Sequence, residues 1–137
     1  SDKQSPYIVL VYFVMILSGD YFASLVGKHF KRKIYISEIS PKKTLSGCIT
    51  HICFTCLASL LLKIFFEISV FNCLLFGLSI SIFSQFGDFA FSAIKRDLGI
   101  KHSSSLFLNY GGIIDRVDAF IFSAPVAYYL LCFVGIF

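Results

Sequence analysis

The sequence predicts an all-α protein, a polytopic integral membrane bundle of about four transmembrane helices. The first observation behind this is composition: apolar residues make up 57% of the 137 residues and charged residues only 15%. A soluble domain carries about 25% charged residues, because its surface faces water. The second observation is that four apolar stretches each approach the roughly 20 residues that a membrane-crossing helix needs. Together they exclude a soluble enzyme, a disordered tail and an extended nucleic-acid-binding protein.

The four stretches are residues 4–27, 44–62, 68–87 and 119–137. Only the first is interrupted by a charge, that of Asp20. The connection between the second and third is short, residues 63–67, so we expect these two helices to form an antiparallel hairpin. A membrane β-barrel is disfavoured, because no stretch alternates lipid-facing with lumen-facing residues.

The basic residues orient the predicted bundle. Ten of the 12 Lys and Arg lie in the loops that join the first span to the second and the third to the fourth. They are Lys28, Lys31, Arg32, Lys33, Lys42, Lys43, Lys95, Arg96, Lys101 and Arg116. The positive-inside bias makes this side cytoplasmic and both termini external. Because the chain begins with Ser and no signal peptide precedes the first span, we expect it to be part of a longer chain or a trimmed one.

The cysteines and one histidine inside the predicted spans are weak signals. The cysteines are Cys48, Cys53, Cys56, Cys73 and Cys132. Two of them form a CxxC pair, but no second pair completes a zinc site, so we expect all five to pack as small apolar residues. His51 is expected to be a helix-packing or interfacial residue, with a catalytic role as the less favoured alternative.

Residues that could bind a ligand or take part in a reaction concentrate between positions 87 and 118. Asp88, Ser92 and Lys95 are spaced so that a continuing helix would place them on one face. Asp115 and Asp118 are three residues apart and share a face at the start of the fourth span. The three acids would thus converge at the cytoplasmic edge of two helices. An acid at the centre of a bilayer costs about 2.5–3.5 kcal/mol, so such residues usually mark a site.

The neighbours of these acids suggest their chemistry. Gly111 and Gly112 permit a sharp turn or a close backbone approach to a ligand. Lys95, Arg96 and Arg116 supply the point charges and guanidinium forks that bind phosphates. Mg²⁺ is commonly held by one or two carboxylates together with substrate phosphates. The set therefore predicts phosphoryl or nucleotidyl transfer at a membrane surface; the alternative is that these charges only end the spans and pair with one another.

In order and spacing, these residues resemble the signature of the phosphatidate cytidylyltransferase family, the CDP-diacylglycerol synthases. The signature stands here as Gly87-Asp88, Ser92-Ala93-Ile94-Lys95-Arg96, Lys101, and Gly111-Gly112-Ile113-Ile114-Asp115-Arg116-Val117-Asp118. A second family segment is matched upstream by Asp20, Ala23, Gly27-Lys28 and Ser40-Pro41-Lys42-Lys43-Thr44. The resemblance covers nearly the whole chain. It implies that residues 1–137 are the C-terminal catalytic membrane domain of a longer enzyme whose N-terminal helices are absent here.

The chain departs from the family pattern at five positions outside the acidic and basic framework. These are His102 for Asp, Tyr110 for His, Leu108 for Pro, Lys42 for Gly and Leu45 for an aromatic residue. Metal and phosphate binding are therefore expected to persist. Any role of the family His in positioning substrate does not carry over, and a catalytically reduced relative is an alternative.

The resemblance implies a Mg²⁺-dependent nucleotidyltransferase of phospholipid biosynthesis, in which CTP and phosphatidate give CDP-diacylglycerol and pyrophosphate. Asp88, Asp115 and Asp118 would hold Mg²⁺, with room for a second cation about 3.5–4 Å away. Lys95, Arg96 and Arg116 would complete the catalytic set by holding phosphates. Further substrate-binding residues would be Asp20, Ser40, Lys43, Thr44, Ser92, Lys101, Gly111 and Gly112. For Asp20, a packing ion pair is an equal alternative.

The expected setting is a multi-pass protein of the cell (inner) membrane, a homodimer that binds no nucleic acid. One rival function is a CTP-dependent lipid-alcohol kinase, such as a polyprenol or phytol kinase, which would transfer the γ-phosphate and release CDP. Another is a non-enzymatic membrane protein of transport or assembly, which would show no Mg²⁺-dependent CTP binding.

Overall fold

The computed structural model describes residues 5–29, 44–99 and 111–134, with the side chains of residues 5 and 111–116 left out. All described elements are helices: α1 (Ser5–His29), α2 (Leu45–Ser59), α3 (Leu61–Phe65), α4 (Val70–Asp97) and α5 (Gly111–Val134). Four helical stretches are long and apolar enough to cross a membrane: Pro6–His29, Leu45–Phe65, Val70–Asp97 and Val117–Val134. The predicted all-α membrane bundle is confirmed.

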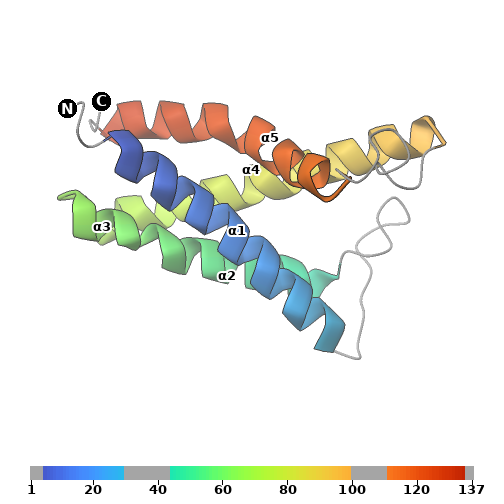
Figure 1. Ribbon diagram of the computed structural model, residues 1–137. Helices are drawn as coiled ribbons and strands as arrows, with labels where there is room; N and C mark the ends of the chain where they lie inside the picture. Colours follow the sequence, from blue (N-terminus) through green and yellow to red (C-terminus); the bar gives the residue numbers. More distant parts are fainter. Residues whose placement is uncertain (1–4, 30–43, 100–110, 135–137) are drawn as a thin grey trace.

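The four long helices run alternately along one axis (Figure 1). The start of α1 and the end of α5 lie at one end of the bundle, and the end of α4 and the start of α5 lie toward the other. Helix α1 crosses α2, while α5 runs beside α4. The predicted antiparallel hairpin of the second and third spans is formed by α2 with α3, followed by α4. Its connection is shorter than expected, because α3 carries the helix through Lys63 to Phe65.

Two helices extend beyond the apolar spans predicted from the sequence, both at the polar end of the bundle. Helix α4 continues past residue 87 to Asp97, because no proline or glycine interrupts this stretch. Basic residues in its last turn also favour a helix C-terminus. Gly99, with φ of 70°, then ends the helix, and its N–H donates to the Arg96 carbonyl at 3.0 Å.

The helix of the fourth predicted span begins before the apolar span itself. Helix α5 starts at Gly111, so Gly111 and Gly112 belong to its first turn and do not form the predicted sharp turn. The acids Asp115 and Asp118 follow the first turn of α5, which itself holds no acidic residue. The alternative expectation for these glycines, close approach to a ligand, stays a prediction.

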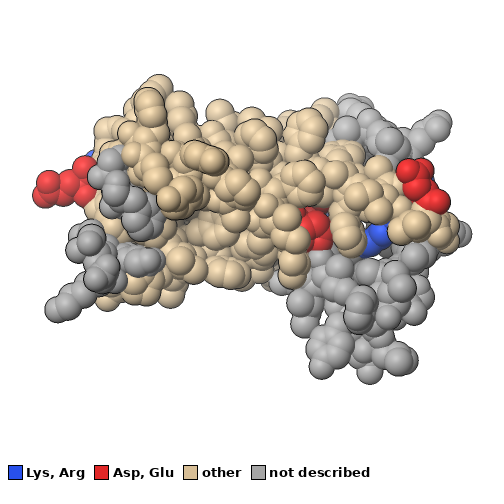
Figure 2. Space-filling view, turned by 90° about the horizontal axis from the view of Figure 1, so that it is seen from above, with Lys and Arg blue, Asp and Glu red and all other residues tan. Residues whose placement is uncertain are grey.

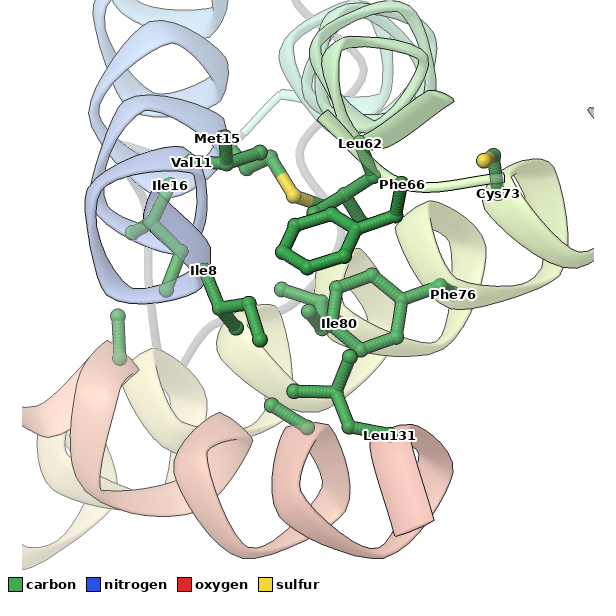
Figure 3. Close-up of a cluster of buried hydrophobic side chains, with 12 residues drawn as sticks. Ile8, Val11, Met15, Ile16, Leu62, Phe66, Cys73, Phe76, Ile80 and Leu131 are labelled. Carbon is green, nitrogen blue, oxygen red and sulfur yellow. The ribbon is translucent and has the colours of Figure 1, made fainter. Parts of the chain in front are cut away.

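The interior combines an apolar cluster with small polar residues. Figure 3 shows Ile8, Val11, Met15 and Ile16 of α1 facing Leu62, Phe66, Phe76 and Ile80, with Leu131 of α5 closing the cluster. Thr55, Ser59, Ser81, Ser84 and Ser123 are also fully buried. Many other large apolar residues lie on the outer surface of the bundle; Phe133, for example, is 89% exposed. This arrangement suits a lipid surround, in which small and polar residues make the contacts between helices.

Candidate functional site

Helices α4 and α5 pack closely together at Gly87, and we call this contact the α4–α5 crossing. A Cβ atom placed on this glycine would lie 2.8 Å from the backbone oxygen of Asp118 and 3.0 Å from the Cβ of Phe122. The two backbones are therefore in contact at this point, and only glycine fits. Asp88 is the next residue of α4. Two of the three predicted metal-binding acids thus belong to the segments where α4 and α5 touch.

The two acids differ in burial. The Asp118 residue is 6% exposed, and Asp88 is half-buried. Both positions lie inside helices that are long and apolar enough to cross a membrane. A carboxylate in such a place is usually matched by a cation, a donor or a function. The geometry of the helix crossing therefore supports a site that holds positive charge here.

The basic residues lie at the end of α4 beyond the crossing. Because a helix rises about 1.5 Å per residue, Lys95 lies roughly 10 Å along the axis from Asp88. Its Nζ is 4.6 Å from the centroid of the Phe91 ring, a cation–π contact that holds the side chain along the helix. Arg96 is exposed, and Ser92, between the acid and the lysine, is half-buried. The predicted order of Asp88, Ser92 and Lys95 on one continuous helix is confirmed.

Figure 2 places this charged end in the context of the whole face. The middle of the visible surface is largely free of acidic and basic side chains, and charged side chains of both signs appear at the left end and also at the right end. The described basic residues of this end are Lys28, Lys95 and Arg96. A polyanionic ligand would meet positive charge at this end, next to the α4–α5 crossing.

Several predicted site residues lie outside the described residues. Ser40, Lys43 and Lys101 are among them, and for Gly111, Gly112, Asp115 and Arg116 only the helical backbone is described. Within the described side chains no group of three His, Cys, Asp or Glu comes together as a metal site. Since α5 is helical from Gly111, positions 115 and 118 are one turn apart. The three-acid metal site therefore stays a prediction.

Thr44 has a structural role that the sequence interpretation missed. Its Oγ1 accepts a hydrogen bond from the Gly47 N–H at 3.2 Å and so caps the N-terminus of α2. The residue is 5% exposed and lies against Gly27 of α1, where a Cβ would be 3.2 Å from the hydroxyl. A Thr directly before a long apolar run is a recognisable N-cap signal. The predicted contact with substrate stays untested.

Asp20 belongs to a polar network between three helices. Its Oδ1 lies 3.1 Å from Nε2 of His51 on α2, and Nδ1 of His51 lies 2.7 Å from the Oγ of Ser81 on α4. The packing interaction expected for Asp20 as one alternative is therefore present, while 31% of its side-chain surface remains accessible. His51 is 3% exposed and packs between helices, as expected, rather than at an interface with water.

The cysteines are all free thiols, and their burial differs. Cys73 is buried, which confirms the packing expectation for this residue. Cys53 and Cys132 are exposed on the surfaces of α2 and α5, so for them that expectation is wrong. A thiol on a lipid-facing surface needs no packing partner, since it behaves as a small apolar group.

Comparison with known proteins identifies the family. The model of the cytidylyltransferase family matches residues 1–134. The phosphatidate cytidylyltransferase of Aquifex aeolicus is 37% identical over 128 residues, which cover 93% of this chain and 48% of the relative. The enzyme of the same name from Bacillus subtilis is 37% identical over 121 residues, covering 86% of this chain and 45% of the relative. That of Rickettsia felis is 33% identical over 137 residues, covering 94% and 60%.

The chain spans about half the length of the curated relatives it matches. The range matched by the family model, residues 1–134, includes the predicted acidic and basic residues and the segments of α4 and α5 that meet at Gly87. The chain belongs to the cytidylyltransferase family.

Proposed function

We propose that this chain is the catalytic part of a phosphatidate cytidylyltransferase, which transfers the cytidylyl group of CTP to phosphatidate. The observation that carries the proposal is the contact at Gly87, which joins the segments bearing Asp88 and Asp118. The similarity to relatives named phosphatidate cytidylyltransferase supports the choice of substrates. The products would be CDP-diacylglycerol and pyrophosphate.

The reaction brings two polyanions together, and the basic residues of the chain would offset the repulsion between their phosphates. An oxygen of the phosphatidate phosphate attacks the α-phosphorus of CTP, and the bond to the β-phosphate oxygen breaks. Lys95 and Arg96, at the end of α4, would hold phosphates of CTP and then the departing pyrophosphate. Arg116 would do the same from α5. No side-chain base is needed, because the attacking oxygen is already ionised.

Mg²⁺ fits the acids at the crossing. It takes hard oxygen donors and commonly binds through one or two carboxylates plus substrate phosphates. Asp88 and Asp118 supply such donors from touching helices, and Asp115 would supply a third. When bound, the cation would neutralise phosphate charge and orient the two reactants. We propose Mg²⁺, with a second cation as an extension of the same site.

The membrane setting follows from the same arrangement. The diacylglycerol tails would lie against the exposed apolar residues of the helices, with the headgroup at the charged end of the bundle. The excess of Lys and Arg in the two loops at this end supports a cytoplasmic orientation in the inner membrane. The homodimer expected from the sequence stays a prediction, to be tested by the mass of the detergent-solubilised protein.

The decisive experiment follows separate phosphates of CTP. The full-length protein is incubated in mixed micelles with phosphatidate, Mg²⁺ and CTP labelled either at the α-phosphate or at the γ-phosphate. We expect the α-label in the lipid extract and the γ-label in water-soluble pyrophosphate. Omission of phosphatidate is the control, because it removes the acceptor and leaves everything else unchanged.

Two outcomes would contradict the proposal. Transfer of the γ-label to a lipid alcohol, in a parallel incubation with a polyprenol or phytol in place of phosphatidate, would identify a CTP-dependent lipid kinase instead. Absence of any labelled lipid, together with absence of Mg²⁺-dependent CTP binding, would favour a non-enzymatic membrane protein.

A further inference from the structure

A second polar cluster lies deeper in the bundle than the α4–α5 crossing. It consists of Asp20 on α1, His51 on α2, and Ser81 and Gln85 on α4. The Gln85 Nε2 lies 3.2 Å from the Ser81 Oγ and 3.4 Å from the Cys48 carbonyl on α2. The cluster thus links three helices that are each long and apolar enough to cross a membrane. We call it the His51 network.

The hydrogen bonds of the network can all be assigned with donation in one direction, from α4 through His51 to α1. Gln85 donates to Ser81, the Ser81 hydroxyl donates to Nδ1 of His51 at 2.7 Å, and Nε2–H of His51 donates to Asp20 at 3.1 Å. In this assignment the imidazole is neutral and uses both nitrogens, one as acceptor and one as donor. Because every polar atom of the imidazole is used, the ring has one orientation.

The helix facing His51 is shaped to receive the ring. A Cβ on Gly19 of α1 would lie 3.0 Å from both Cδ2 and Nε2 of His51, and 2.6 Å from the Oγ1 of Thr55. Glycine therefore lets α1 approach the imidazole closely, directly before Asp20. The carboxylate is held at one oxygen, and part of its surface stays accessible. His51 thus fixes both the separation of α1 from α2 and the direction of the Asp20 side chain.

The network also fixes the helix that carries the proposed site. Gln85 precedes Asp88 by three residues, about one helical turn. Between them, at Gly87, α4 touches the backbone of Asp118. A shift or rotation of α4 relative to α2 would therefore move Asp88 against α5. Interior contacts transmit such shifts because packed helices do not deform smoothly.

We propose that His51 is a positioning residue for cytidylyl transfer: through Asp20 and Ser81 it fixes α1 and α4, and thereby the place of Asp88. This inference rests on the proposed function. His51 touches neither substrate nor cation; it acts through the helices. The nucleotide phosphates would be held at the basic end of α4 and not by His51. Loss of the His51 side chain should therefore affect turnover more than the affinity for CTP.

The test compares His51→Ala with a matched variant of the same helix face. Ser59 is also fully buried on α2, donates to the Cys56 carbonyl and packs against Gly77 of α4, two turns farther from the proposed site. Ser59→Ala therefore removes a buried hydroxyl that packs against α4 and is hydrogen-bonded within α2, without touching the network. His51→Gln is the rescue variant, because a carboxamide also offers one acceptor and a donor.

The measurements are kcat and KM for CDP-lipid formation by the full-length protein in mixed micelles, with melting temperature as a separate readout. We expect His51→Ala to lower kcat on the order of 10- to 100-fold, as a misplaced reacting group does. The KM for CTP should change less than about threefold, as expected when ground-state binding is kept. His51→Gln should recover most of the lost turnover. Ser59→Ala should keep kcat within about threefold of the parent.

The outcomes separate this inference from the proposed function. If the parent is active and His51→Ala loses no more turnover than Ser59→Ala at equal loss of melting temperature, His51 only packs and the inference is wrong. A change in KM alone would also overturn it. If the parent forms no CDP-lipid, the proposed function is wrong and the inference falls with it. If His51→Ala does not fold, Ser81→Ala replaces it, with an expected loss of about tenfold in kcat.

Discussion

Two of the places at which polar side chains lie inside the apolar bundle differ in what surrounds them. The His51 network matches donors with acceptors between α1, α2 and α4. The α4–α5 crossing instead brings the acid-bearing segments of two helices together near a basic helix end. Complementary polar groups stabilise the packing of helices through hydrogen bonds, as is common in membrane bundles. Acids gathered near basic residues suit a ligand with phosphates and a cation.

The largest expected effect comes from removing charge at the crossing. Asp118→Asn keeps the size of the side chain but weakens a ligand for Mg²⁺. A catalytic cation contributes several kcal/mol, so we expect turnover to fall by about 10³-fold or more. The measurement is CDP-lipid formation over a range of Mg²⁺ concentrations.

Asp97→Asn is the matched control for this variant. Asp97 ends α4, is exposed and lies nine positions beyond Asp88. It should retain near-parental activity, because only the general charge of the helix end changes. Equal losses in the two variants would mean that the crossing is not a metal site.

The second effect tests whether the close contact of α4 and α5 matters by itself. Gly87→Ala would place a methyl group 2.8 Å from the backbone oxygen of Asp118, so the helices must separate. Overpacking of this kind costs about 1–3 kcal/mol, partly offset by the better helix propensity of Ala. We expect a loss of turnover of about 10- to 100-fold, because the acids would move apart.

Gly77→Ala tests whether a steric clash elsewhere on α4 lowers turnover as much as Gly87→Ala does. Its Cβ would lie 2.7 Å from the Oγ of Ser59 and 2.8 Å from the Cα of Cys56, a clash of similar severity on the same helix. Melting temperatures of the two variants should fall together, whereas turnover should fall mainly in Gly87→Ala. The same loss of turnover in both would indicate general destabilisation.

The third effect concerns affinity. Lys95→Ala removes a cation that would contact a phosphate, and a hydrogen bond to a charged group contributes about 1.5–3 kcal/mol. We expect the KM for CTP to rise about tenfold or more, with a smaller change in kcat. Lys63→Ala, in α3 at the opposite end of the bundle, is the control and should leave KM unchanged. A fall in kcat alone would place Lys95 outside the binding of CTP.

The sequence predicts the apolar part of the fold better than its polar part. The four spans follow from composition, because any stretch of this length and hydropathy needs a lipid surround. Helices α4 and α5 extend beyond the predicted spans because residues 88–97 and 111–118 carry charges and are nevertheless helical. Hydropathy does not distinguish a helix leaving the membrane from a loop. The order of Asp88, Ser92 and Lys95 could be predicted, since helical spacing is local.

Contacts between helices could not be read from the chain in the same way. Asp20 and His51 are 31 positions apart, and their contact depends on which faces of α1 and α2 meet. Gly19 allows that contact, but its role appears only once the two helices are packed. The backbone contact at Gly87 likewise needs the position of α5. Asp88 and Asp118 are 30 positions apart in the sequence. The motif predicts that the acids converge, and the crossing of two helices is what brings their segments together in space.

The smallest expected effect separates capping from substrate binding at Thr44. The hydroxyl is buried and already accepts the Gly47 N–H, so Thr44→Ala should cost about 0.5–2 kcal/mol of stability. Thr44→Ser should restore it, because Ser caps helices as well as Thr does. The measurement is thermal unfolding in detergent beside kcat/KM for CTP. Ser69→Ala, which removes the cap of α4 at the opposite end, is the control. If Thr44→Ala lowers kcat/KM while Ser69→Ala does not at equal loss of stability, the hydroxyl also contacts substrate. If the two variants change kcat/KM equally, Thr44 only caps α2 and belongs with the polar groups that hold the helices together.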